Sequence, residues 1–236
     1  MTLFNPHIKR SAFVLTFFIA TTLCAAQTFS KEQLLGKITP SKDTNFTLIA
    51  AKHTDKKNIY LNKKAYKAFE EMSAAAAKEG IQIKIISATR TFEAQKAIWE
   101  KKWVRSDYVK FPEQQRVKEI MKYSSMPGTS RHHWGTDIDI NSLENSYFEK
   151  TEGKKLYQWM LANAASFGFY QTYTSKSGGR TGYEEEKWHW SYLPIAEPML
   201  TEYQKTIEYN DINGFSGSQY AAVNKVIEEY VLGILK

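Results

Sequence analysis

The sequence predicts an α+β protein, because segments with the two-residue periodicity of strands occur beside segments with helical periodicity. Residues 81–88 and 133–140 alternate apolar and polar side chains, which predicts strands. Across residues 60–80, apolar side chains recur every three or four positions, and Gly80 stands where a helix would end. Hydrophobic residues make up 42% of the 236 residues and charged residues 24%, values that exclude a wholly disordered or collagen-like chain.

The remaining elements are predicted by the same patterns. We expect helices over residues 91–104, 112–123, 154–167 and 219–235, a short aromatic strand over 188–192, and a mobile Gly/Ser-rich loop over 172–181. Residues 27–58 are polar and mixed and have no firm periodicity. We find no internal repeat and no linker, so residues 27–236 are predicted to form a single domain with a helical C-terminal segment.

The first residues are typical of a secretory signal peptide. Lys9 and Arg10 precede thirteen uncharged, mostly apolar residues, 11–23, a run too short for a comfortable membrane span. Small residues follow, and we place cleavage after Ala26, so that residues 1–26 are the signal peptide. Cleavage would remove Cys24, the only cysteine, which suits export to the periplasm or cell envelope without a membrane span. The alternative is a retained membrane anchor.

The formal net charge of +7 is compatible with several anionic partners. A basic protein is drawn to nucleic acid, to a membrane surface, or to an anionic polymer such as cell wall. The charge alone does not choose among them.

Histidines and carboxylates occur in two unusual groups. His132 precedes Asp139 by seven residues, and Glu186 precedes His189 by three. Two histidines and one carboxylate from separate segments form a ligand set that zinc accepts, with a fourth position left for water. Alternate residues of a strand point the same way, so Asp137 and Asp139 are both candidates for the carboxylate. We expect His53, in a lysine-rich stretch, to be a surface residue.

Three motifs, in this order along the chain, resemble those of the VanY-type D-alanyl-D-alanine carboxypeptidases. These are zinc peptidases of the M15 family, grouped with lysostaphin-type enzymes and the hedgehog signalling domain. The motifs are Ser87, Arg90 and Gln95 in Ser-x-x-Arg-x-x-x-x-Gln; Ser130, His132, Gly135 and Asp139 in Ser-x-His-x-x-Gly-x-x-x-Asp; and Glu186, Trp188, His189 and Tyr192 in Glu-x-Trp-His-x-x-Tyr.

The resemblance implies a small antiparallel sheet that carries one zinc ion and is flanked by helices. It implies that His132, Asp139 and His189 bind the zinc and that Glu186 is the catalytic base. It further implies that Arg90 holds the substrate carbonyl or carboxylate, helped by two further residues, Gln95 and Ser130. The implied substrates are peptidoglycan stem peptides rather than nucleic acid, and the implied activity is that of a D-alanyl-D-alanine carboxypeptidase. We expect the protein to be a monomer.

Three residues depart from the pattern of that family. Asp137 stands where a small residue is usual, Lys187 replaces a common proline, and Ser191 stands where arginine is frequent. None of these removes an implied ligand or the base. Three functions stay open: the carboxypeptidase; an endopeptidase or L,D-carboxypeptidase of the same fold; and a non-catalytic, zinc-stabilised wall-binding module. Retention of both Glu186 and Arg90 argues against the last.

Overall fold

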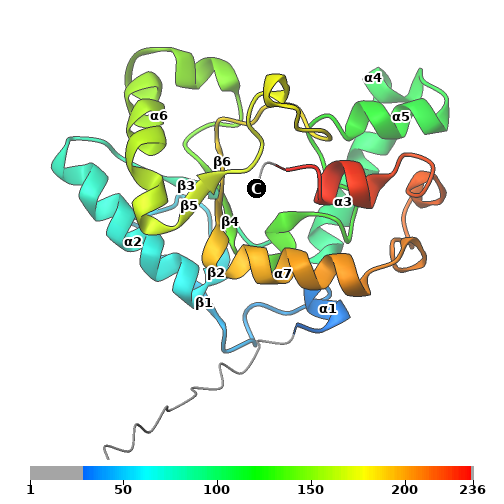
Figure 1. The fold of residues 1–236 in the computed structure, drawn as a ribbon, viewed down its shortest axis with the longest axis horizontal. Coiled ribbons are helices and arrows are strands. Elements are labelled where there is room, and N and C mark those ends of the chain that lie inside the picture. The colour runs from blue at the N-terminus through cyan, green and yellow to red at the C-terminus, as the bar shows by residue number, and fades with distance from the viewer. Residues whose placement is uncertain (1–28, 235–236) are drawn as a thin grey trace, which may run out of the picture.

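The computed structural model describes residues 29–234, and it confirms the predicted α+β class (Figure 1). The helices are α1 (Lys31–Leu34), α2 (Lys63–Lys78), α3 (Phe92–Trp103), α4 (Ser106–Val109), α5 (Glu113–Ile120), α6 (Thr151–Asn163) and α7 (Leu193–Thr206). The strands are β1 (Phe46–Leu48), β2 (Tyr60–Asn62), β3 (Ile85–Ser87), β4 (Asp137–Ile140), β5 (Phe169–Gln171) and β6 (His189–Tyr192). Strands β1 and β2 form a small antiparallel pair, and the other four form an antiparallel sheet in the order β3-β4-β6-β5.

The two faces of the four-stranded sheet differ in chemistry. Strands β4 and β6 are paired so that Asp139 lies opposite His189 and Ile138 lies opposite Trp190. Because side chains alternate along a strand, one face carries isoleucine and tryptophan and the other carries carboxylates and imidazole. The polar face is nevertheless buried, since Asp137 is 0% and Asp139 4% exposed.

Two hydrophobic clusters support the sheet. The apolar face packs against α2 and α6, with Phe69, Met72 and Trp159 in that cluster. The second cluster joins α1, α3, α5 and α7 and includes Trp99 and Tyr203. Figure 1 places α2 and α6 on one side of the sheet and α3 and α5 on the other. The polar face of the sheet therefore looks toward the boundary between the two clusters.

The predicted strand over 133–140 is shorter than expected. Residues Arg131–Trp134 form a 3-10 turn, and the strand begins only at Asp137. Gly135 joins them in the left-handed conformation, with φ 70°, and a Cβ there would lie 2.3 Å from Phe46 Cε1. Glycine is the residue that adopts this conformation without steric cost. The predicted strand over 81–88 is likewise reduced to β3.

The predicted C-terminal helix over 219–235 is wrong. The chain there forms a 3-10 turn at Ser218–Tyr220 and a short π-helical segment at Val226–Val231. Lys225 between them has φ 48°, in the left-handed region, which interrupts any continuous helix. Val223, expected on the apolar face, is 60% exposed. The apolar residues of 226–231 still contribute to the second cluster.

His53 is buried rather than on the surface, so that expectation is also wrong. It is 7% exposed, and its Nδ1 lies 2.8 Å from the Tyr66 hydroxyl. The ring packs edge-on against Phe69 at a centroid distance of 5.2 Å. Tertiary packing of α2 covers this histidine although its sequence neighbours are lysines.

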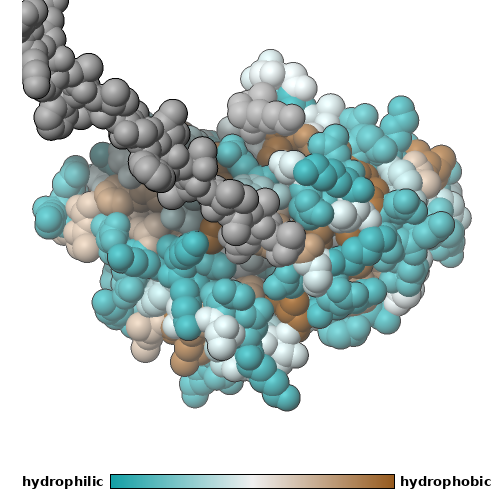
Figure 2. Space-filling view, turned by 60° about the horizontal axis from the view of Figure 1, so that its bottom comes forward, coloured by the Kyte–Doolittle hydropathy of each residue, from teal (hydrophilic) through white to brown (hydrophobic). Residues whose placement is uncertain are grey.

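The face shown in Figure 2 is largely hydrophilic, with hydrophobic side chains exposed in separate patches. Within residues 29–234, no helix combines the length and the apolar character that crossing a membrane requires. The predicted signal peptide, residues 1–26, lies outside the described part of the chain.

Candidate active site

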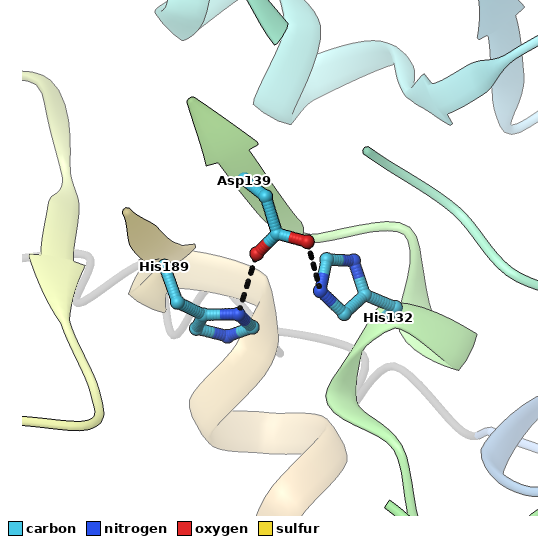
Figure 3. Close-up of side chains that lie close together, drawn as sticks. All are labelled: His132, Asp139 and His189. Carbon is cyan, nitrogen blue, oxygen red and sulfur yellow. Dashed lines mark hydrogen bonds and ion pairs between the residues drawn. The ribbon is translucent and has the colours of Figure 1, made fainter. Parts of the chain in front are cut away.

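Three side chains from different elements converge on the polar face of the sheet (Figure 3). His132 comes from the 3-10 turn, Asp139 from β4 and His189 from β6. Asp139 Oδ2 lies 3.3 Å from His132 Nε2, and Asp139 Oδ1 lies 3.0 Å from His189 Nδ1. One donor atom from each residue lies within 4.8 Å of the others, so the set could hold a metal ion. Of the two aspartates that the sequence left open, Asp139 belongs to this set.

The hydrogen bonds of His132 suit a metal ligand. Its Nδ1 lies 2.8 Å from the carbonyl oxygen of Ala88, and an N–H there donates to that carbonyl. The Nε2 atom then carries a lone pair, is buried, and has no hydrogen-bond partner among the described residues. A lone pair aimed at a carboxylate in a buried site is unfavourable unless a cation lies between them. The donors therefore fit a divalent metal such as zinc.

His189 lies between two aspartates. Its Nε2 lies 2.8 Å from Asp137 Oδ2, and its Nδ1 faces Asp139. Burial lowers the pKa of this imidazole, but the hydrogen bonds to Asp137 and Asp139 prevail and raise it to about 9. Both ring nitrogens of His189 thus face carboxylates, which favour its protonated form in the metal-free protein.

A buried arginine compensates the extra carboxylate. Arg131 is 1% exposed, and its Nε lies 3.0 Å from Asp137 Oδ2. Burial alone would raise the pKa of Asp137, but the Arg131 guanidinium and His189 hold it well below its usual range. Asp137 is thus ionised, and its charge is paired with that of Arg131.

Glu186 lies at the edge of the donor set without joining it. Its Oε2 is 3.8 Å from His189 Nδ1, too far for a hydrogen bond. The backbone N–H of Glu186 donates to the Tyr173 carbonyl at 2.9 Å, which holds the segment before β6. Burial raises the pKa of this carboxyl to about 8 in the metal-free protein, and Arg90 and Lys102 act in the opposite direction. A carboxyl with a pKa near neutrality suits proton transfer.

The donor set opens into a cleft of about 630 Å³. Its lining includes Arg90, Lys102, Tyr108, Tyr123, Ser124, Ser125, Asn145, Tyr173, Tyr183, Glu186 and the three donors. The Nε atom of Arg90 is buried and has no hydrogen-bond partner in the described part of the chain. Lys102 Nζ donates to Ser124 Oγ. Within residues 29–234, neither cation has a carboxylate at ion-pair distance, so the cleft offers two cationic groups to an anionic ligand.

Two residues of the implied substrate site do not line this cleft. Gln95 is 1% exposed, and its Nε2 donates to the Ser125 carbonyl at 2.7 Å, so it supports a cleft-lining residue from behind. Ser130 is also 1% exposed, and its hydroxyl has no partner among the described residues. Arg90, by contrast, does line the cleft, and its backbone N–H donates to the His132 carbonyl at 3.1 Å.

The second histidine of the pair serves as a buried connector. His133 Nδ1 donates to the Arg90 carbonyl at 2.7 Å, and its Nε2 accepts from the Gly128 N–H at 3.0 Å. Burial lowers the pKa of His133 to about 3, so it stays neutral. Trp134 beside it packs against Arg131 and Tyr203.

Several cleft residues lie outside the sequence motifs. Lys102 on α3, Tyr173 and Tyr183 belong to none of the three motifs. The Tyr173 ring lies 4.5 Å from the His189 ring, centroid to centroid. These side chains reach the cleft through helix packing and loop course, which leave no local signal in the sequence.

Known proteins resemble this chain in sequence. The profile of the family described as VanY, D-alanyl-D-alanine carboxypeptidase, matches residues 58–195. The protein YodJ of Bacillus subtilis is 32% identical over 139 residues, which cover 57% of this chain and 46% of YodJ. A D-alanyl-D-alanine carboxypeptidase of Enterococcus faecalis is 29% identical over 126 residues, which cover 53% of this chain and 46% of that protein. The matches thus span about half the length of these relatives.

Solved structures share the fold. VanYB in complex with D-alanine-D-alanine superposes with a TM-score of 0.54 at 22% identity, covering 78% of this chain and 92% of that one. A mutant VanY D,D-pentapeptidase from a VanB-type cassette, in complex with Zn(II), superposes with a TM-score of 0.50 at 23% sequence identity. The superposition covers 73% of this chain and 93% of that one. The LdcB LD-carboxypeptidase superposes with a TM-score of 0.53 at 21% sequence identity, covering 76% of this chain and 78% of that one.

Proposed function

This chain belongs to the VanY family of D-alanyl-D-alanine carboxypeptidases, and from that membership we propose that it is a zinc-dependent carboxypeptidase acting on peptidoglycan stem peptides. The observation that carries the proposal is the convergence of two imidazoles and one carboxylate within 4.8 Å, beside a buried glutamate that is not one of them. That division, with three donors and one separate carboxyl group, is what metal-assisted peptide hydrolysis requires.

We propose His132, Asp139 and His189 as the ligands of one zinc ion. Zn(II) is present in the VanY D,D-pentapeptidase structure that shares this fold. Bound here, zinc would polarise the scissile carbonyl and lower the pKa of a water molecule. The protein contributes the orientation of the donors, because the Ala88 carbonyl and the Asp137 carboxylate each bind the far nitrogen of one histidine.

Glu186 is proposed as the general base and then the general acid. Its carboxylate would take a proton from the attacking water and deliver it to the leaving amine as the C–N bond breaks. Water is thus divided between the new carboxylate and the released amino acid. The burial of Glu186 and its position 3.8 Å from His189 Nδ1 support this role.

Arg90 and Lys102 are proposed to bind the anionic end of the peptide. Both line the cleft, and a guanidinium can pair with a carboxylate through two hydrogen bonds. A terminal D-alanine carboxylate would meet these groups while its peptide bond lies near Glu186. VanYB has been solved with D-alanine-D-alanine, a ligand with this chemistry.

The reaction is tested with defined substrates. Purified protein with zinc is incubated with a stem pentapeptide, a stem tetrapeptide and a cross-linked dimer, and products are identified by mass. Loss of one alanine from the pentapeptide alone supports a D,D-carboxypeptidase. Cleavage of the tetrapeptide would instead indicate L,D specificity, and cleavage of the dimer an endopeptidase. A zinc-loaded protein that releases no fragment would be a wall-binding module.

The ligands are tested by metal analysis of single variants. Wild type should contain about one zinc per chain, the count for a single catalytic site. His132→Ala, Asp139→Ala and His189→Ala should each lose the metal, because two remaining donors hold zinc weakly. Full zinc retention by all three folded variants would contradict the assignment.

We also propose export to the periplasm or cell envelope as a monomeric single domain, residues 27–236, after cleavage at Ala26. The short apolar run that follows Lys9 and Arg10 supports this. N-terminal sequencing of protein recovered from cell envelopes should begin at Gln27, and size-exclusion chromatography with light scattering should give a monomer mass. A mature chain that still carries residues 11–23 would indicate a membrane anchor.

A further inference from the structure

Asp137 is a buried carboxylate that contacts a proposed zinc ligand from the side opposite the metal site. Its Oδ2 lies 2.8 Å from His189 Nε2, whereas His189 Nδ1 lies 3.0 Å from Asp139. The two ring nitrogens of one imidazole thus face two different aspartates. Because β4 places Asp137 and Asp139 on the same face of the sheet, His189 on β6 fits between them.

The Asp137 carboxylate is itself held in one orientation. The hydroxyls of Thr136 and Ser191 donate to its Oδ1 at 2.7 and 2.8 Å. Arg131 Nε donates to Oδ2 at 3.0 Å, and Arg131 Nη2 donates to the Ser191 hydroxyl at 2.7 Å. Every one of these contacts offers a hydrogen to the carboxylate or to its support. The arrangement is therefore built to keep an ionised acceptor in place, and it costs the burial of an ion pair.

We propose that Asp137 is a positioning residue of the metal site: it accepts the Nε2–H of His189 and so presents the Nδ1 lone pair to the metal. This inference rests on the proposed zinc-peptidase function. A hydrogen bond to the far nitrogen sets the tautomer and raises the basicity of an imidazole ligand. For His132, the neutral carbonyl of Ala88 accepts the corresponding hydrogen bond, from Nδ1. For His189 the acceptor is the charged carboxylate of Asp137, which makes His189 the more basic of the two histidine ligands.

Arg131 and Ser191 both hold the Asp137 carboxylate in place. A second carboxylate so near the Asp139 carboxylate adds negative charge to a buried site, and Arg131 offsets it. Ser191 has a small side chain, and Arg131 Nη2 donates to its hydroxyl. Asp137 and Ser191 lie opposite each other on β4 and β6, and Arg131 donates a hydrogen bond to each of them.

The first test uses the wild-type protein and needs no variant. Protein labelled with nitrogen-15 histidine is loaded with cadmium-113, and scalar coupling reports which ring nitrogen binds the metal. The inference predicts coupling to Nδ1 of His189, a retained proton on its Nε2, and coupling to Nε2 of His132. Coupling to Nε2 of His189 would overturn it.

The second test measures zinc affinity by competition with a chromophoric chelator. Asp137→Ala should weaken zinc binding 10–100-fold, the usual effect of losing such a partner. Asp137→Asn should lie between Asp137→Ala and wild type, because its amide oxygen still accepts the hydrogen but carries no charge. Tyr66→Phe is the matched control: it removes a buried hydrogen bond to His53, in the cluster behind the apolar face of the sheet, and should leave zinc affinity unchanged.

The outcomes separate the two proposals. A wild type that binds neither zinc nor cadmium contradicts the proposed function and this inference together. A wild type that binds zinc while folded Asp137→Ala binds it within twofold of wild type overturns the inference alone. If Asp137→Ala does not fold because Arg131 is left unpaired, the double variant Arg131→Met/Asp137→Ala removes both charges, and the same 10–100-fold loss is expected.

Discussion

Glu186 is the residue on which turnover should depend while metal binding does not. Glu186→Gln should retain zinc and lower the rate of D-alanine release by about 10²–10⁴-fold, because it removes a positioned proton-transfer group. The measurement is steady-state hydrolysis at saturating zinc, with metal content determined on the same sample. Glu184→Gln is the control, since Glu184 pairs with Lys176 at 2.8 Å and should not affect the rate. Wild-type turnover in Glu186→Gln would contradict the mechanism.

His53 should make stability depend on pH. The Tyr66 hydroxyl accepts from the Ala50 N–H and donates to Nδ1 of His53, which requires a neutral imidazole. Burial lowers the pKa of His53 below its usual value of 6.5, so the unfolded state takes up the proton first as pH falls. The stabilisation is therefore present above pH 6.5 and is lost below it.

Urea unfolding at several pH values measures this effect. The difference in unfolding free energy between wild type and His53→Gln should shrink as pH falls from 7 to 5, because glutamine does not titrate. A difference that is constant over this range would show that His53 has the same pKa in both states.

At the scale of elements, the connection between the 3-10 turn and β4 depends on Gly135. Gly135→Ala should destabilise the protein in urea by more than the roughly 1–2 kcal/mol of a left-handed alanine, because its Cβ would also meet Phe46 at 2.3 Å. Gly80→Ala is the matched control: its φ is +73°, but nothing lies within 4 Å of a Cβ there. Equal losses in the two variants would mean that the contact with Phe46 relaxes freely.

At the scale of the whole molecule, the proposed zinc ion would link the 3-10 turn, β4 and β6 where the two hydrophobic clusters meet. Free zinc at 1,000 times its dissociation constant should stabilise the fold by about 4 kcal/mol. For a domain of this size that corresponds to a rise in melting temperature of roughly 8–16 °C. Calorimetry with zinc and with a chelator measures the shift. Identical melting curves, together with bound zinc, would mean that the metal also binds the unfolded chain.

Short-range patterns were enough to predict the α+β class and most elements. The helical periodicity of 60–80 reflects burial on one face of α2, and the alternation in 133–140 reflects the separation of apolar and polar side chains onto opposite faces of β4, both of them buried. The predicted helix over 219–235 failed because apolar spacing does not reveal that Lys225 adopts a left-handed conformation. His53 was misplaced because its burial depends on α2 rather than on its sequence neighbours.

The motifs brought His132, Asp139, His189, Glu186 and Arg90 to one expected site, and all five line a single cleft. Their roles stay predictions. Other features of the site follow only from the three-dimensional structure. It shows that Nδ1 of His189 faces Asp139 and that Arg131 pairs with Asp137. It also shows that Lys102 lines the cleft, whereas Gln95 lies behind the cleft wall. These features depend on strand register and helix packing, which bring together residues far apart in the sequence, such as Arg131 and Ser191, 60 positions apart. A motif states which residue types are present; the fold sets the distances and orientations on which their chemistry depends.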